Sequence, residues 1–235
     1  SDSLAQPFER PHGRLSKWFS IAYNGNLANY DKLKNQLENV GYNMTYDSDT
    51  EIIMHYLSRD MQKNSPKDNI DFKNLLSELD LEFDGAWNLC FVNAEGKFFA
   101  SRDPNGFHPL SYGIGEDFII VSSESNVISN LHIEPYDLQP GTVLTIDPAK
   151  SGYTISPFAT ATKNHCFFEY IYFANTSSIS DNTSVYRTRE KIGLQLAQEE
   201  TKSYDSTDYV VVPVPDTSYV AGSQYAAAME LPFVA

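Results

Sequence analysis

The stretch IAYNGNLANYDKL, residues 21–33, decides how the first part of the chain is interpreted. The residues up to Ala22 form an apolar run typical of a buried strand, and a helical pattern begins only a few residues after Asn24 and Gly25. We therefore predict that the strand ends at this Asn-Gly pair. A turn is one explanation, because Asn-Gly is the commonest signal for a two-residue hairpin. The other is a site for a negative group, bound by backbone N–H groups and the primary amide of Asn24.

Size and composition indicate a globular protein. The chain has 235 residues, of which 41% are hydrophobic and 13% aromatic, enough for one large domain or two small ones. Its net charge of −14 offers no basic surface to neutralise phosphates, which argues against nucleic acid as a partner. No apolar run approaches the roughly 18 residues of a membrane-spanning helix, and no signal-peptide pattern is present. We expect a cytoplasmic protein that contacts neither nucleic acid nor membranes.

The cysteines and histidines show no pattern of a disulfide framework or a zinc site. The two cysteines, Cys90 and Cys166, lie in apolar or aromatic surroundings. A secreted disulfide scaffold would carry more cysteines, so we expect a reducing compartment. The five histidines have no ligand spacing such as HxxxH, and no metal site is predicted. Cys90 has no nearby histidine partner and fits an inert core thiol.

Helical spacing of apolar residues predicts three helices early in the chain, over residues 30–40, 48–61 and 72–79. Asn29 is the expected N-cap of the first helix. Ser48, with Glu51 three residues later, has the pattern of a capping box and opens the second helix. Between these two helices, residues 42–46 are predicted to form a short strand.

From Ala86 onward the pattern changes to short strands separated by turn signals such as NAEG and LQPG. Helices followed by antiparallel strands suggest a layered domain of sheet and helices. A second change occurs near residue 160. There an aromatic strand-like run, HCFFEYIYFA, precedes a helix, and DYVVVPVP then has the continuous apolar character of a buried parallel strand. An Ala-rich helix follows, as in the opening of a βαβ unit, and we expect the chain to be truncated at that end.

The motifs NGNLANYDKL and SDTE resemble those of class II glutamine amidotransferases, whose glutaminase has an N-terminal-nucleophile fold. ASRDPNGFHPL, SSES, LQPGTV, CFFEYIYFA, SVYRTREKIG and VPVPDTS follow in an order similar to that of the amidophosphoribosyltransferase family. The resemblance covers nearly the whole chain and implies an α+β fold. Residues 1–160 would form an αββα layered glutaminase domain of the N-terminal-nucleophile hydrolase type, lacking its first strands. Residues 161–235 would form an interdomain segment and the beginning of an α/β phosphoribosyltransferase-type domain.

The resemblance also implies site residues. In the family an Asn-Gly pair supplies the oxyanion hole, a role that falls here on the side-chain amide of Asn24 and the N–H of Gly25. Donors aimed at developing negative charge in a dry site contribute about 3–4 kcal/mol each. Asp49, in the SDTE motif, would bind the α-amino group of glutamine. Helix capping is the alternative role of Asp49.

Two parts of the family's machinery do not occur in this sequence. One is the cysteine nucleophile at a mature N-terminus. SDSLAQPF resembles the stretch that follows the family's glutamine-clamping arginine, so we expect the chain to begin after both. Ser1, with its α-amino group as the base, is the alternative nucleophile. The other missing part is an RGTTS-like phosphate loop. We therefore expect the chain by itself neither to release ammonia from glutamine nor to make phosphoribosylamine.

The segment PDTS matches the family's first loop at the phosphoribosyl pyrophosphate site, which implies substrate contacts for Asp216, Thr217 and Ser218. A plain strand-to-helix connection capped by Asp or Ser explains this segment equally well. We expect Mg²⁺ in the full-length transferase and no metal or cofactor bound by this segment. Cys166 matches an iron–sulfur ligand of some relatives, but a cluster needs four ligands and the chain has two cysteines. The expected partners are glutamine, phosphoribosyl pyrophosphate and further copies of the same protein.

The sequence departs from the family pattern in three motifs. Tyr23 stands where the family usually has His, and His108 and Asn175 stand where it has Arg. Neither His nor Asn replaces the bidentate donors of Arg. Two hypotheses remain. The first is a segment of a glutamine-dependent amidophosphoribosyltransferase, which catalyses the first committed step of purine synthesis. The second, motivated by the missing nucleophile and these departures, is a non-catalytic paralogue that binds a ligand or partner. Retention of both the Asn-Gly pair and Asp49 favours the first.

Overall fold

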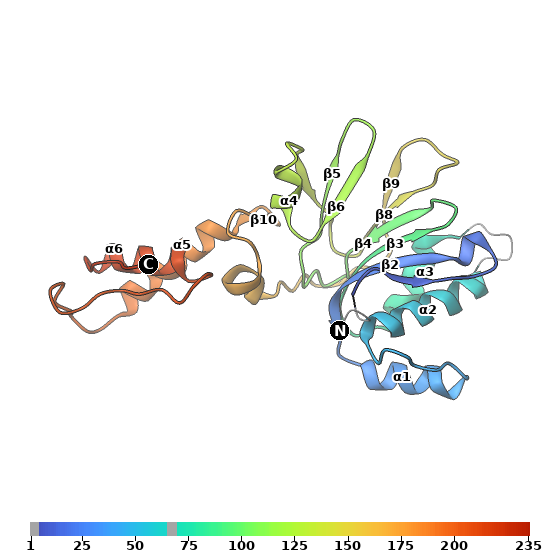
Figure 1. The fold of residues 1–235 in the computed structure, drawn as a ribbon, viewed down its shortest axis with the longest axis horizontal. Coiled ribbons are helices and arrows are strands. Elements are labelled where there is room, and N and C mark those ends of the chain that lie inside the picture. Colours follow the sequence, from blue (N-terminus) through green and yellow to red (C-terminus); the bar gives the residue numbers. More distant parts are fainter. Residues whose placement is uncertain (1–4, 65–69) are drawn as a thin grey trace. The chain divides into compact units, whose positions relative to one another are not determined.

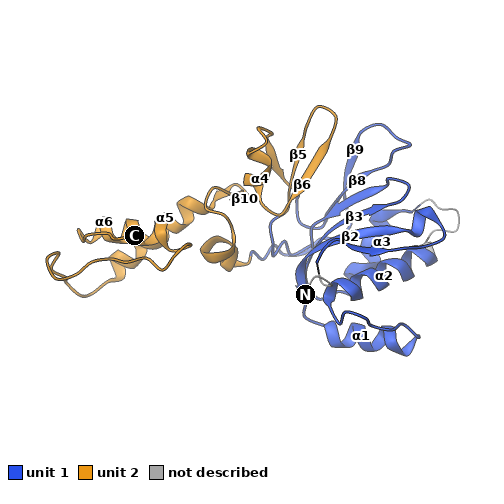
Figure 2. Cartoon of the chain, in the orientation of Figure 1, with its two compact units in different colours: residues 1–109, 138–165 blue, residues 110–137, 166–235 orange. Residues whose placement is uncertain are grey.

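A computed structural model describes residues 5–64 and 70–235 of the chain. These residues fall into two compact units (Figure 2). One unit contains the described residues up to Pro109 and the segment Leu138–His165; the other contains Leu110–Asp137 and Cys166–Ala235. The longer segment of the second unit thus begins close to the domain boundary predicted after residue 160. That boundary stays a prediction.

A six-stranded antiparallel sheet is the centre of the first unit, with strand order β1-β2-β3-β4-β8-β9. Its strands are β1 (Phe8–Arg10), β2 (Phe19–Leu27), β3 (Gly85–Asn93), β4 (Phe98–Ser101), β8 (Thr142–Ile146) and β9 (Tyr153–Pro157). A short 3₁₀ turn, η2 (Leu15–Lys17), separates β1 from β2. The strands β3, β4 and β8 lie in the part of the chain where short strands separated by turn signals were predicted.

Three helices belong to this unit: α1 (Tyr30–Asn39), α2 (Asp49–Asn64) and α3 (Phe72–Asp80). Figure 1 shows α2 and α3 lying along one face of the sheet. The apolar face of α3 is buried there, and Phe72 at its start packs edge-on against Phe91 of β3 with ring centroids 5.4 Å apart. Phe91 in turn stacks on Phe99 of β4 at 4.9 Å. Burial of these aromatic rings therefore holds α3 against the sheet.

Two predictions for this unit were wrong. Strand β2 does not end at the Asn-Gly pair but continues to Leu27, because Asn24 and Gly25 pair in register with β3. Residues 42–46 form no strand. The backbone N–H groups of Thr45 and Tyr46 donate instead to the carboxylate of Glu51, at 2.6 and 2.8 Å, which removes them from any sheet ladder.

The second unit contains a three-stranded antiparallel sheet of order β6-β5-β7 and a small hairpin. Its elements are β5 (Ser111–Ile114), β6 (Ile119–Ser122), α4 (Ser125–Ser129), β7 (Pro135–Asp137), β10 (Ile179–Ser180), β11 (Thr183–Ser184), α5 (Val185–Glu199) and α6 (Tyr219–Ala228). Ser184 caps α5, since its hydroxyl accepts a hydrogen bond from the Arg187 N–H at 3.3 Å. The helices α5 and α6 lie where the sequence predicted them, whereas α4 was not predicted.

Two strand predictions in the second unit were also wrong. The aromatic run contains a single π-helical turn, η3 (Glu169–Phe173), in place of a strand. The run DYVVVPVP forms only one parallel bridge, between Val211 and Phe233. Val212 and Val214 are 65% and 77% exposed, so the run is not buried in the described chain. A continuous apolar run becomes a buried strand only where neighbouring strands and helices cover both faces.

Within residues 5–64 and 70–235, none of the helices combines the length and the apolar character that crossing a membrane would require.

Candidate functional site

The edge of β2 that faces away from β3 brings the predicted site residues together. In an antiparallel strand, N–H groups two residues apart point to the same edge. The N–H of Tyr23 donates to the Gln6 side-chain oxygen, and the N–H of Leu27 donates to Asp49 Oδ2 at 2.8 Å. Gly25 lies between these two positions, so its N–H faces the same edge. The sequence-predicted oxyanion donor therefore lies beside the sequence-predicted carboxylate.

Glycine is the only residue type that fits at position 25 of the strand. A Cβ atom there would stand 2.0 Å from the carbonyl oxygen of Ala86 in β3 and 2.9 Å from Cε2 of Tyr23. The close approach of the two backbones thus requires the missing side chain. The neighbouring Asn24 pairs with Asn88 in the ladder, and its side chain is exposed. The amide of Asn24 is therefore accessible to a ligand.

Asp49 is the first residue of α2. One oxygen of its carboxylate is hydrogen-bonded within the protein, and the side chain is partly exposed to solvent. Oδ2 accepts the N–H of Leu27 at 2.8 Å and the hydroxyl of Tyr23 at 3.5 Å. No described residue hydrogen-bonds Oδ1, and the side chain is partly exposed. A carboxylate fixed through one oxygen and open at the other can pair with an ammonium group.

Glu51 holds the start of α2 in place. The residue as a whole is 1% exposed, and its carboxylate accepts the backbone N–H groups of Thr45, Tyr46 and Asp47 at 2.6, 2.8 and 3.0 Å. The Ser48 hydroxyl accepts the Glu51 N–H at 3.3 Å, as the capping-box pattern predicted. Glu51 also orders the loop just before Asp49, a role that the sequence analysis did not predict. The capping-box pattern indicates a helix cap but not a buried carboxylate that accepts three backbone N–H groups of the preceding loop.

His55, one turn further along α2, is buried next to two charged groups. Its Nδ1 lies 3.3 Å from the guanidinium of Arg10 in β1, and its Nε2 lies 3.7 Å from Glu51 Oε1. Burial, and after it the charge of Arg10, lowers the pKa of His55, while Glu51 opposes the shift. Because Arg10 is a donor only, Nδ1 accepts and the neutral ring carries its proton on Nε2.

This environment predicts a pH-dependent stability. Below about pH 6.5, the ordinary pKa of histidine, the unfolded chain binds a proton that folded His55 resists. The contribution of His55 to the free energy of unfolding should therefore be fully present above that pH and decrease as the pH falls below it. Urea unfolding between about pH 5 and 8 would measure this. His55→Gln should flatten the dependence; an equally steep decline in that variant would contradict the assignment.

The loop after β4 is organised by Arg102, which is fully buried. Its guanidinium donates to the carbonyl oxygens of His108, Leu138 and Gly106 at 2.8, 3.1 and 3.2 Å. Asp103 Oδ1 accepts the Gly106 N–H at 2.8 Å, and burial raises the pKa of this carboxyl group. His108, a departure from the family pattern, thus contributes its backbone oxygen to this network.

The predicted transferase residues lie in the second unit. Asp216 and Thr217 are in the turn that precedes α6, and Ser218 is its N-cap residue without a side-chain capping bond. The Ser218 hydroxyl donates to the carbonyl oxygen of Val214. Ser218 also lines a cavity of about 400 Å³ beside α5 and α6, together with apolar side chains such as Val212.

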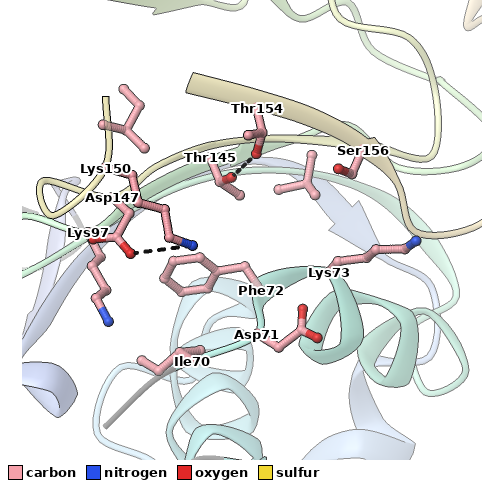
Figure 3. A pocket seen from close by; sticks show the side chains of 12 residues that line it. Ile70, Asp71, Phe72, Lys73, Lys97, Thr145, Asp147, Lys150, Thr154 and Ser156 are labelled. Atoms are coloured by element: carbon pink, nitrogen blue, oxygen red, sulfur yellow. Dashed lines mark hydrogen bonds and ion pairs between the residues drawn. The ribbon is translucent and has the colours of Figure 1, made fainter. Parts of the chain in front are cut away.

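A second cavity, of about 360 Å³, is lined by residues around the start of α3 and by β8 and β9 (Figure 3). Lys150 lies 4.0 Å from Asp147, and the hydroxyls of Thr145 and Thr154 are 2.7 Å apart. Neither this cavity nor the one beside α5 and α6 is lined by Asn24, Gly25 or Asp49. The candidate site lies outside both cavities, along β2 beyond Ile21, the last residue that pairs with β1.

Among the described residues, neither a metal cluster nor an activated thiol is found near this edge. In the part of the chain that the structure describes, no group of three or more His, Cys, Asp or Glu side chains could hold a metal ion. Burial raises the pKa of Cys90 to about 11, so its thiol stays protonated near neutral pH.

Comparison with known proteins identifies the class. The model of the glutamine amidotransferase domain family matches residues 1–130, and the chain belongs to that family. Within it, the chain is similar to amidophosphoribosyltransferases. The enzyme of Methanothermobacter thermautotrophicus is 34% identical over 234 residues, covering 97% of this chain and 46% of that protein. The Bacillus subtilis enzyme is 35% identical over 218 residues, covering 91% of this chain and 42% of that protein.

A solved structure agrees with this result. Glutamine phosphoribosylpyrophosphate amidotransferase from Bacillus subtilis, in complex with ADP and GMP, matches with a TM-score of 0.82 and 31% identity, over 97% of this chain and 48% of that one. The resemblance and the α+β glutaminase fold predicted from the motifs are therefore confirmed. The chain spans about half the length of the curated relatives it matches.

Proposed function

We propose that the chain is part of a glutamine-dependent amidophosphoribosyltransferase and carries its glutamine-binding edge. The longer protein would convert glutamine, phosphoribosyl pyrophosphate and water into phosphoribosylamine, glutamate and pyrophosphate. The observation that supports this proposal is the edge of β2, where the Gly25 N–H faces the same side as the Leu27 N–H that donates to Asp49, next to the exposed residue Asn24. The similarity to amidophosphoribosyltransferases supports the same reaction.

The three groups would divide the work of binding and catalysis. The open Oδ1 of Asp49 would accept the α-ammonium group of glutamine. The amide of Asn24 and the N–H of Gly25 would donate to the oxygen of the side-chain carbonyl as it gains negative charge, which is worth about 3–4 kcal/mol for one such donor. The attacking group implied by the family resemblance is an N-terminal cysteine; the protonated thiol of Cys90 does not fit that role.

For the transferase half-reaction we propose that Asp216, Thr217 and Ser218 contact phosphoribosyl pyrophosphate. The turn they form before α6 supports this, because backbone N–H groups at such a turn suit phosphate oxygens. We propose Mg²⁺ as the metal ion of the transferase reaction in the longer protein. We further propose a cytoplasmic homo-oligomer.

Ammonia release from glutamine tests the proposal. The longer protein should turn over glutamine, whereas residues 1–235 alone should not. In the longer protein, Asp49→Asn should raise the KM for glutamine about 10- to 100-fold, because the ammonium loses a charged hydrogen-bond acceptor. Glutamine binding without any turnover by the longer protein would favour a non-catalytic paralogue. If residues 1–235 alone released ammonia from glutamine at ordinary enzyme rates, Ser1 would become the candidate nucleophile.

A further inference from the structure

Tyr23 lies between the two halves of the candidate site. Its hydroxyl is 3.1 Å from the carbonyl oxygen of Ala86 and 3.5 Å from Asp49 Oδ2. Its ring lies against Gly25, since Cε2 is 2.9 Å from where a Cβ on that residue would stand. One side chain therefore contacts the strand position that supplies the oxyanion donor and the carboxylate that faces the ammonium group.

We propose that Tyr23 is a positioning residue that fixes the Asp49 carboxylate relative to the Gly25 N–H. The inference rests on the proposed glutamine site and names a residue that sets its geometry. Leu27 and Tyr23 donate to the same oxygen, Oδ2, so rotation of the carboxylate would break both hydrogen bonds. This keeps Oδ1 turned outward for a ligand. A carboxylate held by Leu27 alone would keep more rotational freedom.

The phenol has one proton and two acceptors within reach. While Asp49 is unpaired, its negative charge favours the hydrogen bond to Oδ2, although the distance to Ala86 O is shorter. When an ammonium group neutralises Asp49, the hydroxyl can rotate toward Ala86 without leaving its place. Burial, followed by Asp49, raises the pKa of Tyr23, with Asp103 contributing less, so the donor keeps its proton at neutral pH.

Amide hydrogen exchange on residues 1–235 tests the positioning without any ligand. Tyr23→Phe keeps the ring against Gly25 and removes only the hydroxyl. The Leu27 N–H should then exchange about fivefold faster relative to the Phe91 N–H in the core of the sheet. Tyr30→Phe is the matched control, because its hydroxyl donates to Asp47 at 2.6 Å and not to Asp49. Unchanged relative exchange of Leu27 in Tyr23→Phe would overturn the inference.

Kinetics of the longer protein supply a second measurement. Tyr23→Phe should raise the KM for glutamine about fivefold with a smaller change in kcat, and Tyr30→Phe should change neither. If Asp49→Asn raises KM but Tyr23→Phe does not, the inference fails while the proposed function stands. If the wild-type protein does not use glutamine, the proposed function fails, and the exchange of the Leu27 N–H still decides whether Tyr23 positions Asp49.

Discussion

Gly25→Ala is expected to lower the free energy of unfolding by about 3 kcal/mol or more and to abolish glutamine turnover in the longer protein. The new methyl group would stand 2.0 Å from the carbonyl oxygen and 2.6 Å from the carbonyl carbon of Ala86. Both are backbone atoms of β3 and cannot rotate away as the end of a side chain could. Relief requires β2 to separate from β3, which displaces the Gly25 N–H from its position relative to Asp49.

Urea unfolding followed by tryptophan fluorescence measures this cost. Gly13→Ala is the matched control, because a Cβ at Gly13 has no atom within 4 Å. That variant should stay within about 0.5 kcal/mol of the wild type. Equal stability of the two variants would show that β2 and β3 are farther apart at Gly25 than described. The site would then not depend on this close approach.

Much of the fold could be predicted from local patterns. The helical spacing of Leu33 and Leu37 placed α1, and the apolar face of residues 72–79 placed α3 almost to the residue. Each of these helices packs one face on a core, so its buried apolar residues recur in the sequence at helical spacing. The site residues, in contrast, came only from the family resemblance. Composition and spacing alone could not tell a ligand-binding Asp49 from a helix cap.

The two wrong predictions in the first unit share a physical cause: tertiary contacts overrode local preference. Asn-Gly favours a turn by itself, but here the pair is flanked by residues that hydrogen-bond across to β3 and lies within a continuous ladder. Residues 42–46 favour a strand by composition, yet the buried Glu51 carboxylate takes their N–H groups. The Tyr23–Asp49 contact joins positions 26 residues apart in sequence, a pairing that no local pattern contains.

Arg102→Met is expected to cost about 4 kcal/mol of unfolding free energy, the range seen when one partner of a buried charged network is removed. Methionine roughly fills the space of the Arg stem but donates no hydrogen bond. The carbonyl oxygens of Gly106, His108 and Leu138 would lose the guanidinium donors that reach them at 3.2, 2.8 and 3.1 Å. Asp103 would also lose the nearby positive charge that opposes the rise of its pKa on burial.

Arg187→Met is the control that separates this network from the general loss of an arginine. The Arg187 side chain is 72% exposed and pairs with Glu190 at 2.7 Å, so its replacement should change stability by less than about 0.5 kcal/mol. Arg102→Lys should recover only part of the loss, because one ammonium cannot reproduce a planar fork of donors aimed at three oxygens. If Arg102→Lys were as stable as the wild type, charge alone would hold the loop. If Arg102→Met lowered the free energy of unfolding no more than Arg187→Met does, the carbonyl oxygens of the loop would have other donors.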